Sequence, residues 1–159
     1  MPFNNSFTIA HWSGDNYSTM YIDEKSKQQF DFICEKVVSI TGFSRELFLG
    51  KSRKRELVYV RSAIVAALSS NGWTVKKIGY IIGGRDHSTA IHSREHFNNT
   101  IKLMATKGDE LSLMALNIYD VLNKYLLLNR DMNRIQKIQV ANDMRMKGCG
   151  IYSVVGVCN

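Results

Sequence analysis

Two adjacent glycines, Gly83 and Gly84, separate a short apolar segment from a longer polar one, and they constrain the fold more than any other feature. Before them, residues 75–82 have the apolar spacing of a short helix, with Thr74 in the capping position. After them, Asp86 is placed to cap a second helix with a polar start. Because glycine tolerates the backbone conformations of a tight turn, the region has the pattern of a helix-turn-helix.

Helical spacing also dominates the sequence before this region. Apolar residues recur every three or four positions from Glu24 to Gly42, and a glycine is suited to end a helix. Ser44 is placed to cap a short turn, and a longer helix ends at Asn71-Gly72. We therefore expect an all-α fold.

The C-terminal part continues the pattern after Gly108. Apolar residues keep helical spacing over 109–128, and a weaker helix is expected over 132–146. The 109–128 helix is expected either to cover the preceding bundle or to hold a homodimer or a protein partner. The expected divisions are a flexible N-terminal arm over 1–23, a helix-turn-helix domain over 24–107, a helical extension over 108–147 and a glycine-rich tail over 148–159.

The chain has a formal net charge of +7 and a sequence pI near 9.4, which favours a polyanionic partner: nucleic acid or an anionic membrane surface. No stretch approaches the roughly 20 apolar residues that cross a bilayer, and the N-terminus lacks a signal-peptide pattern. Cys34, Cys149 and Cys158 have no metal-ligand spacing, and Cys34 falls within an apolar pattern typical of a core. We expect a cytoplasmic, nucleoid-associated protein without membrane contact.

The run Gly83-Gly84-Arg85-Asp86-His87-Ser88-Thr89 carries a resemblance to a known family. It resembles the Gly-Gly-Arg-Asp-His-Thr-Thr signature in the C-terminal domain of the bacterial replication initiator DnaA, where a basic loop leads into the helix that precedes the helix-turn-helix. The basic residues of 51–55 match that loop. Ser88 stands where the family has threonine, and Val60 where it has proline. The resemblance implies a DnaA C-terminal, Trp-repressor-like helix-turn-helix bundle with a helical C-terminal extension.

The resemblance, with the basic residues around it, also assigns contacts with DNA. The helix tip of Asp86, His87, Ser88 and Thr89 is expected to contact base edges in the major groove. Arg53 matches the arginine that enters the minor groove, where narrow A·T tracts attract cations. Phosphate contacts are expected from Lys51, Lys54, Arg55, Arg61, Lys76, Lys77, Arg85 and His92. Lys76 and Lys77 could equally belong to an exposed helix face that contacts nothing. Arg85 could instead form a bridge to an acidic residue inside the fold.

These assignments predict a sequence-specific double-stranded DNA-binding protein. It would recognise a short site resembling a DnaA box, in replication initiation or its regulation or in transcription. The alternative is an interaction or adaptor protein of a phage or mobile element, tethered to DNA.

A metal-dependent nuclease is the third and lowest-ranked hypothesis. His92 and His96 lie one helical turn apart, a spacing that can present two imidazoles to one metal ion. The sequence shows no third ligand, no catalytic triad and no Gly-x-x-x-x-Gly-Lys-Ser/Thr loop with them. We therefore expect no enzyme activity, no metal site and no cofactor.

Overall fold

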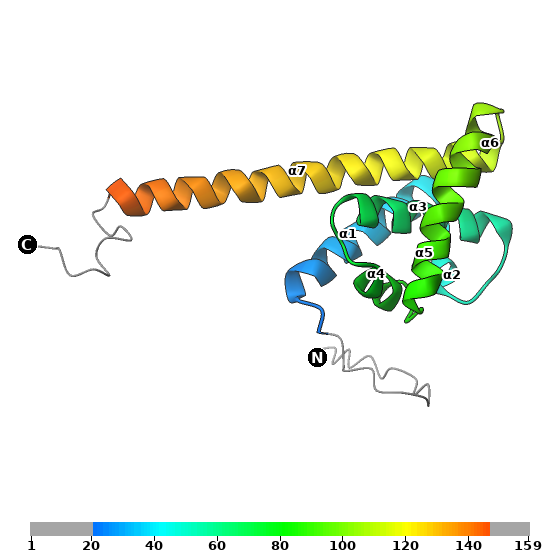
Figure 1. Cartoon of the computed structure of the whole chain (residues 1–159), viewed down its shortest axis with the longest axis horizontal. Coiled ribbons are helices and arrows are strands. Elements are labelled where there is room, and N and C mark those ends of the chain that lie inside the picture. Colours follow the sequence, from blue (N-terminus) through cyan, green and yellow to red (C-terminus); the bar gives the residue numbers. More distant parts are fainter. Residues whose placement is uncertain (1–20, 147–159) are drawn as a thin grey trace, which may run out of the picture.

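A computed structural model describes residues 21–146, and all the regular structure in this part of the chain is helical. The helices are α1 (Glu24–Thr41), α2 (Arg45–Leu49), α3 (Arg55–Ser70), α4 (Val75–Ile81), α5 (His87–His96), η1 (Phe97–Ile101), α6 (Lys102–Thr106) and α7 (Glu110–Met146). They form a bundle with the long α7 lying across one side (Figure 1). The expected all-α helix-turn-helix bundle with a helical extension is confirmed. The predicted tail, and the predicted arm up to residue 20, lie outside the described residues.

Helix α1 has the predicted limits because both of its ends are capped. The Asp23 carboxylate accepts hydrogen bonds from the Ser26 backbone N–H, at 3.1 Å, and from the Ser26 hydroxyl, at 2.7 Å. At the other end Gly42 has a φ of 72°, in the left-handed region, and its N–H donates to the Val38 carbonyl at 2.8 Å. This is the conformation that glycine adopts at least cost.

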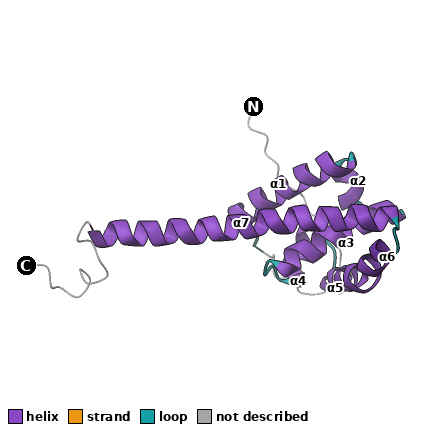
Figure 2. Ribbon diagram, turned by 90° about the horizontal axis from the view of Figure 1, so that it is seen from above, coloured by secondary structure: helices purple, strands orange, loops and turns teal. Residues whose placement is uncertain are grey.

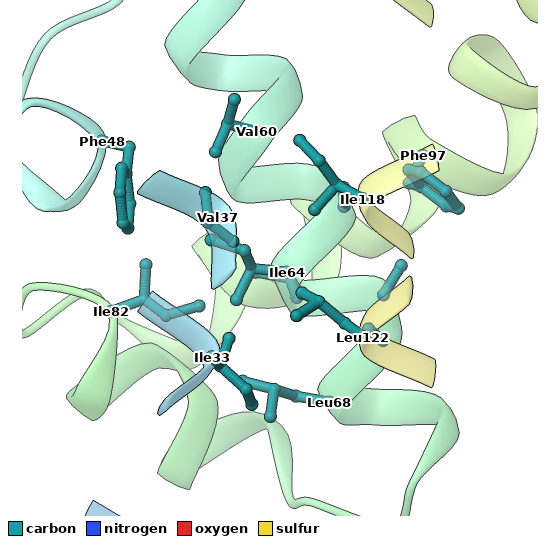
Figure 3. Close-up of a cluster of buried hydrophobic side chains, with 14 of the residues drawn as sticks. Ile33, Val37, Phe48, Val60, Ile64, Leu68, Ile82, Phe97, Ile118 and Leu122 are labelled. Atoms are coloured by element: carbon teal, nitrogen blue, oxygen red, sulfur yellow. The ribbon is translucent and has the colours of Figure 1, made fainter. Parts of the chain in front are cut away.

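Helix α3 is at the centre of the bundle. It contacts α2, α4, α5, η1 and α7, and almost every residue from Leu57 to Leu68 is buried. Figure 3 shows part of this core, with Ile33 and Val37 from α1, Phe48 from α2, Val60, Ile64 and Leu68 from α3, and Ile118 and Leu122 from α7. Cys34 is buried in the same core, as predicted, and burial raises the pKa of its thiol to about 12.

A π-helical segment, η1, interrupts the helix that follows the turn. Phe97, Ile101 and Ala105 are buried at four-residue spacing, whereas Met104 is only half-buried. A π turn takes up an extra residue, so side chains four apart stay on one face longer than they would in a regular α-helix. Ala105, rather than the adjacent Met104, therefore takes the core position at the end of this face.

Helix α7 is one continuous helix of 37 residues, so the expected division into two helices is wrong. No glycine or proline between residues 110 and 146 interrupts it. At 1.5 Å per residue it is about 55 Å long. Ala115, Ile118, Leu122 and Leu126 are buried, but no residue from 127 to 143 is, and this half projects beyond the other helices (Figures 1 and 2). Among residues 21–146, no helix is long and apolar enough to cross a membrane.

Candidate nucleic-acid interface

Helices α4 and α5 are joined by the predicted glycine turn. The Thr74 hydroxyl caps α4 by accepting a hydrogen bond from the Lys77 N–H at 3.4 Å. Gly83 and Gly84 have φ angles of 78° and 64°, and the Gly84 N–H donates to the Tyr80 carbonyl at 2.9 Å. Two consecutive left-handed residues reverse the chain within a few positions, which produces the predicted helix-turn-helix.

Gly79, inside α4, lets the turn fold back onto this helix. The Arg85 N–H donates to the Gly79 carbonyl at 2.7 Å. A Cβ at Gly79 would come within 2.5 Å of the Arg85 carbonyl oxygen and 3.1 Å of that of Asp86. Sequence reasoning did not identify this residue as functional, although a lone glycine within a helical pattern is itself a sign of close backbone approach.

The N-terminus of α5 presents a fixed polar tip. One Asp86 carboxylate oxygen accepts from the His87 backbone N–H at 2.7 Å, and the other accepts from the Ser88 hydroxyl at 2.5 Å. The Ser88 hydrogen bond is the main cause of the lowered pKa of Asp86, so this carboxyl is ionised at neutral pH. His87 and Ser88 are exposed, whereas Thr89 is half-buried. The predicted residues therefore lie together at the start of one helix.

The side chain of Arg61 is buried rather than free, which argues against its predicted phosphate contact. Its guanidinium donates to the backbone carbonyls of Phe48 and Gly50, each at 3.2 Å, and of Ser52, at 2.5 Å. Burial is the main cause, and the nearby Arg85 charge the second cause, of a pKa lowered to about 10. Arg61 therefore fastens the basic loop to the core.

Arg85 takes part in the same arrangement. It is half-buried, and its guanidinium also donates to the Gly50 carbonyl. Of its two predicted roles, the bridge inside the fold is the one that this geometry favours, although the acceptor is a carbonyl and not a carboxylate. A Cβ at Gly83 would collide with the Leu49 carbonyl oxygen, so the turn lies directly against the start of the basic loop.

Two further predicted phosphate contacts also have partners within the fold. Arg55 forms an ion pair with Asp109 at 3.2 Å and donates to the Tyr59 hydroxyl at 3.1 Å. Lys77 donates to the Ser26 hydroxyl at 2.6 Å and lies 4.3 Å from the centre of the Trp73 ring. These contacts connect α3 with Asp109, the residue before α7, and α4 with α1, and they compete with any contact to DNA.

The remaining predicted cations are exposed. Within the described part of the chain, no carboxylate forms an ion pair with these side chains, which are Lys51, Arg53, Lys54 and Lys76. His92 is exposed one turn beyond the α5 tip. The cationic loop therefore lies beside the polar helix tip. In such an arrangement cations can contact the phosphates of a DNA duplex while polar side chains contact bases in a groove.

The two histidines considered as metal ligands differ in their surroundings. His96 is half-buried and packs edge-on against the Tyr59 ring, with 5.5 Å between the ring centroids. His92 is exposed. Among the described residues, no three His, Cys, Asp or Glu side chains are grouped closely enough to hold a metal ion.

Comparison with known proteins bears on the same region. Residues 30–96, less than half of the chain, match the family model described as the bacterial DnaA protein helix-turn-helix. The match begins in α1 and ends with α5, so it includes the basic loop, the glycine turn and the polar tip. Neither a search of curated proteins nor a search of solved structures gave a match. This segment is thus similar to the DnaA helix-turn-helix, and the likeness supports DNA binding.

Proposed function

We propose that this chain binds a short double-stranded DNA site resembling a DnaA box through its DnaA-type helix-turn-helix. The α5 tip of Asp86, His87, Ser88 and Thr89 enters the major groove, and Arg53 enters the adjacent minor groove. Lys51, Lys54, Lys76 and His92 contact phosphates. Such a protein acts at the nucleoid, in replication initiation, its regulation or transcription, and catalyses no reaction.

One observation supports this proposal above the others: the basic loop and the polar helix tip are fastened to each other. Arg61 and Arg85 donate to the same Gly50 carbonyl, and Gly83 lies against Leu49. The basic loop, which would contact phosphates, and the α5 tip, which would contact bases, therefore have a fixed relative position before DNA binds. Preorganisation of this kind lowers the entropy cost of association.

The roles of the four cations that have partners within the fold follow from the same geometry. Arg61 and Arg85 hold the loop, while Arg55 and Lys77 join helices, so we assign these four to positioning rather than to phosphate contact. The cations left for DNA lie on one loop and on the exposed side of α4. The expected footprint is therefore small.

A titration of the full chain on labelled duplexes tests the proposal. We expect tighter binding to duplexes that contain a DnaA-box-like sequence than to scrambled duplexes of the same composition. A plot of the logarithm of the association constant against the logarithm of the salt concentration should have a slope of about −3 to −4, because three or four cations contact phosphates. Binding that ignores sequence would contradict site recognition, and no binding at low salt would contradict the whole proposal.

A further inference from the structure

An apolar stripe with mostly exposed side chains begins in the packed half of α7 and continues along its projecting half. Val121, Leu128, Met132 and Ile135 are exposed by 37, 57, 54 and 48%. With Tyr125 included, the intervals between successive residues of the stripe are alternately four and three positions, which is the spacing of a coiled-coil seam. We call these five residues the α7 seam.

Contacts from the rest of the described bundle cover the seam only at Tyr125. Phe32 of α1 stacks on Tyr125 with 4.1 Å between the ring centroids, and Lys25 of α1 donates to Asn133 at 3.0 Å. Both contacts come from one side of α7. Among the described residues, none buries the seam positions on either side of Tyr125.

Charge on α7 indicates what kind of surface fits the seam. The seam itself is uncharged, and Arg130, Arg134 and Lys137 lie about half a turn away from it, on the opposite side of the helix. A helix lying on an anionic bilayer would place cations along the border of its apolar face. Between residues 121 and 137, Lys124 is the one cation at the border of the seam, and Asp131 lies on the same border. The other three cations lie on the far side, which suits a second helix, because two seams can meet without bringing these charges together.

We propose that the occupant is the α7 seam of a second copy of this chain, packed antiparallel. With Tyr125 opposite Leu128 of the other copy and Val121 opposite Met132, Lys124 of each copy lies beside Asp131 of the other. Lys124 and Asp131 are both exposed and form no ion pair within the described part of the chain. The antiparallel register therefore makes two reciprocal ion pairs, whereas a parallel register places Asn129 opposite Lys124.

The position of α7 keeps this interface separate from DNA. In Figure 1 the column formed by α5, η1 and α6 has the polar α5 tip at one end and the start of α7 at the other. Two copies joined through α7 therefore keep both tips free. The proposal does not depend on DNA binding, and its test contains no DNA.

Sedimentation of the full chain in reducing buffer, over a concentration series, is the test. We expect a reversible equilibrium between the 18.1 kDa chain and a species of twice that mass. Leu128→Asp should abolish the larger species while circular dichroism shows unchanged helix content, because this side chain is 57% exposed. A chain that stays at monomer mass throughout, or a dimer that survives Leu128→Asp, overturns the proposal.

Charge reversals test the antiparallel register. Lys124→Asp should raise the dimer dissociation constant about tenfold, since two weak attractions become repulsions. Asp131→Lys should do the same, and the double exchange of Lys124→Asp with Asp131→Lys should restore wild-type affinity. Arg134→Asp, which changes the net charge equally on the opposite side, is the matched control and should leave the dimer intact. Equal effects of Lys124→Asp and Arg134→Asp, or no rescue, would overturn this register.

Discussion

Basic side chains around the helix-turn-helix differ in what they contact, and this difference separates the residues proposed to bind DNA from those that position the loop and the helices. Arg53 is exposed, whereas Arg61 is only 7% exposed and donates to three backbone carbonyls. Arg61 shares a helix face with Leu57, Ile64 and Leu68, at four-residue and three-residue spacing. Its interior position was therefore visible in the sequence, although the partners of its guanidinium were not.

Arg61→Ala should destabilise the fold before any DNA is added. Losing the hydrogen bonds of a buried guanidinium, and leaving carbonyls without donors, costs about 2–4 kcal/mol. Chemical denaturation of the free protein measures this cost, with the exposed Arg53→Ala as a control expected to stay within about 0.5 kcal/mol of wild type. Unchanged stability together with a salt slope reduced by about one would instead identify Arg61 as a phosphate contact.

His87→Ala should reduce discrimination between DNA sequences rather than binding in general. His87 is exposed at the capped start of α5, where a base contact contributes about 1–3 kcal/mol of specificity. Competition assays on cognate and scrambled duplexes give the ratio of affinities, which should fall by a factor between about 5 and about 150. An equal loss on both duplexes would show that the α5 tip does not read bases.

At the scale of the elements, the helix-turn-helix depends on two glycines for different reasons. Gly84 has a φ of 64° and open space around its Cα, so only its backbone conformation is special. Gly79 has ordinary helical geometry but no room for a side chain beside the Arg85 carbonyl. The requirement for a left-handed backbone at Gly84 is local. The requirement for no side chain at Gly79 exists only because the chain folds back onto α4.

Gly79→Ala should therefore destabilise the protein by about 1–3 kcal/mol, since a methyl group forces the turn away from α4. Gly84→Asn is the matched control and should change stability little, because asparagine tolerates left-handed backbone. Thermal unfolding of both variants measures the difference. If Gly79→Ala were as stable as wild type, the close approach of α4 and the turn would have no energetic importance.

At the scale of the whole molecule, the bundle core and the C-terminal helix are not separate. Ile118, Leu122 and Leu126 from the first half of α7 are buried against the bundle. Burying three such side chains contributes about 5–9 kcal/mol, which is comparable with the total stability of a small domain. We therefore propose that the folding unit extends from α1 to about Asn129 rather than ending near Lys107.

Truncation tests this extent directly. A chain ending at Asn129 should unfold cooperatively and keep its DNA preference, although it should lose self-association because Met132 and Ile135 are absent. A chain ending at Lys107 should not fold cooperatively, because it lacks the three buried α7 residues. Denaturant titrations followed by circular dichroism compare the two. A cooperatively folded chain ending at Lys107 would restrict the folding unit to the residues before α7.

The sequence by itself determined the features that depend on neighbouring residues. Caps at Asp23 and Asp86, the stop at Gly42 and the glycine turn all involve hydrogen bonds or backbone angles within about one turn of chain. Residue type and spacing are therefore sufficient to predict the order of helices from α1 to α5 and the position of the polar tip.

Only the tertiary structure decided which cations stay free for DNA. Lysine and arginine side chains are long, and their partners are chosen by what lies across the fold. Gly50 is 11 residues from Arg61 and 35 from Arg85, and Ser26 is 51 residues from Lys77. The π segment likewise packs against α3 and α7, which are distant in the sequence. Contacts of this separation are set by chain topology, which local residue patterns do not encode.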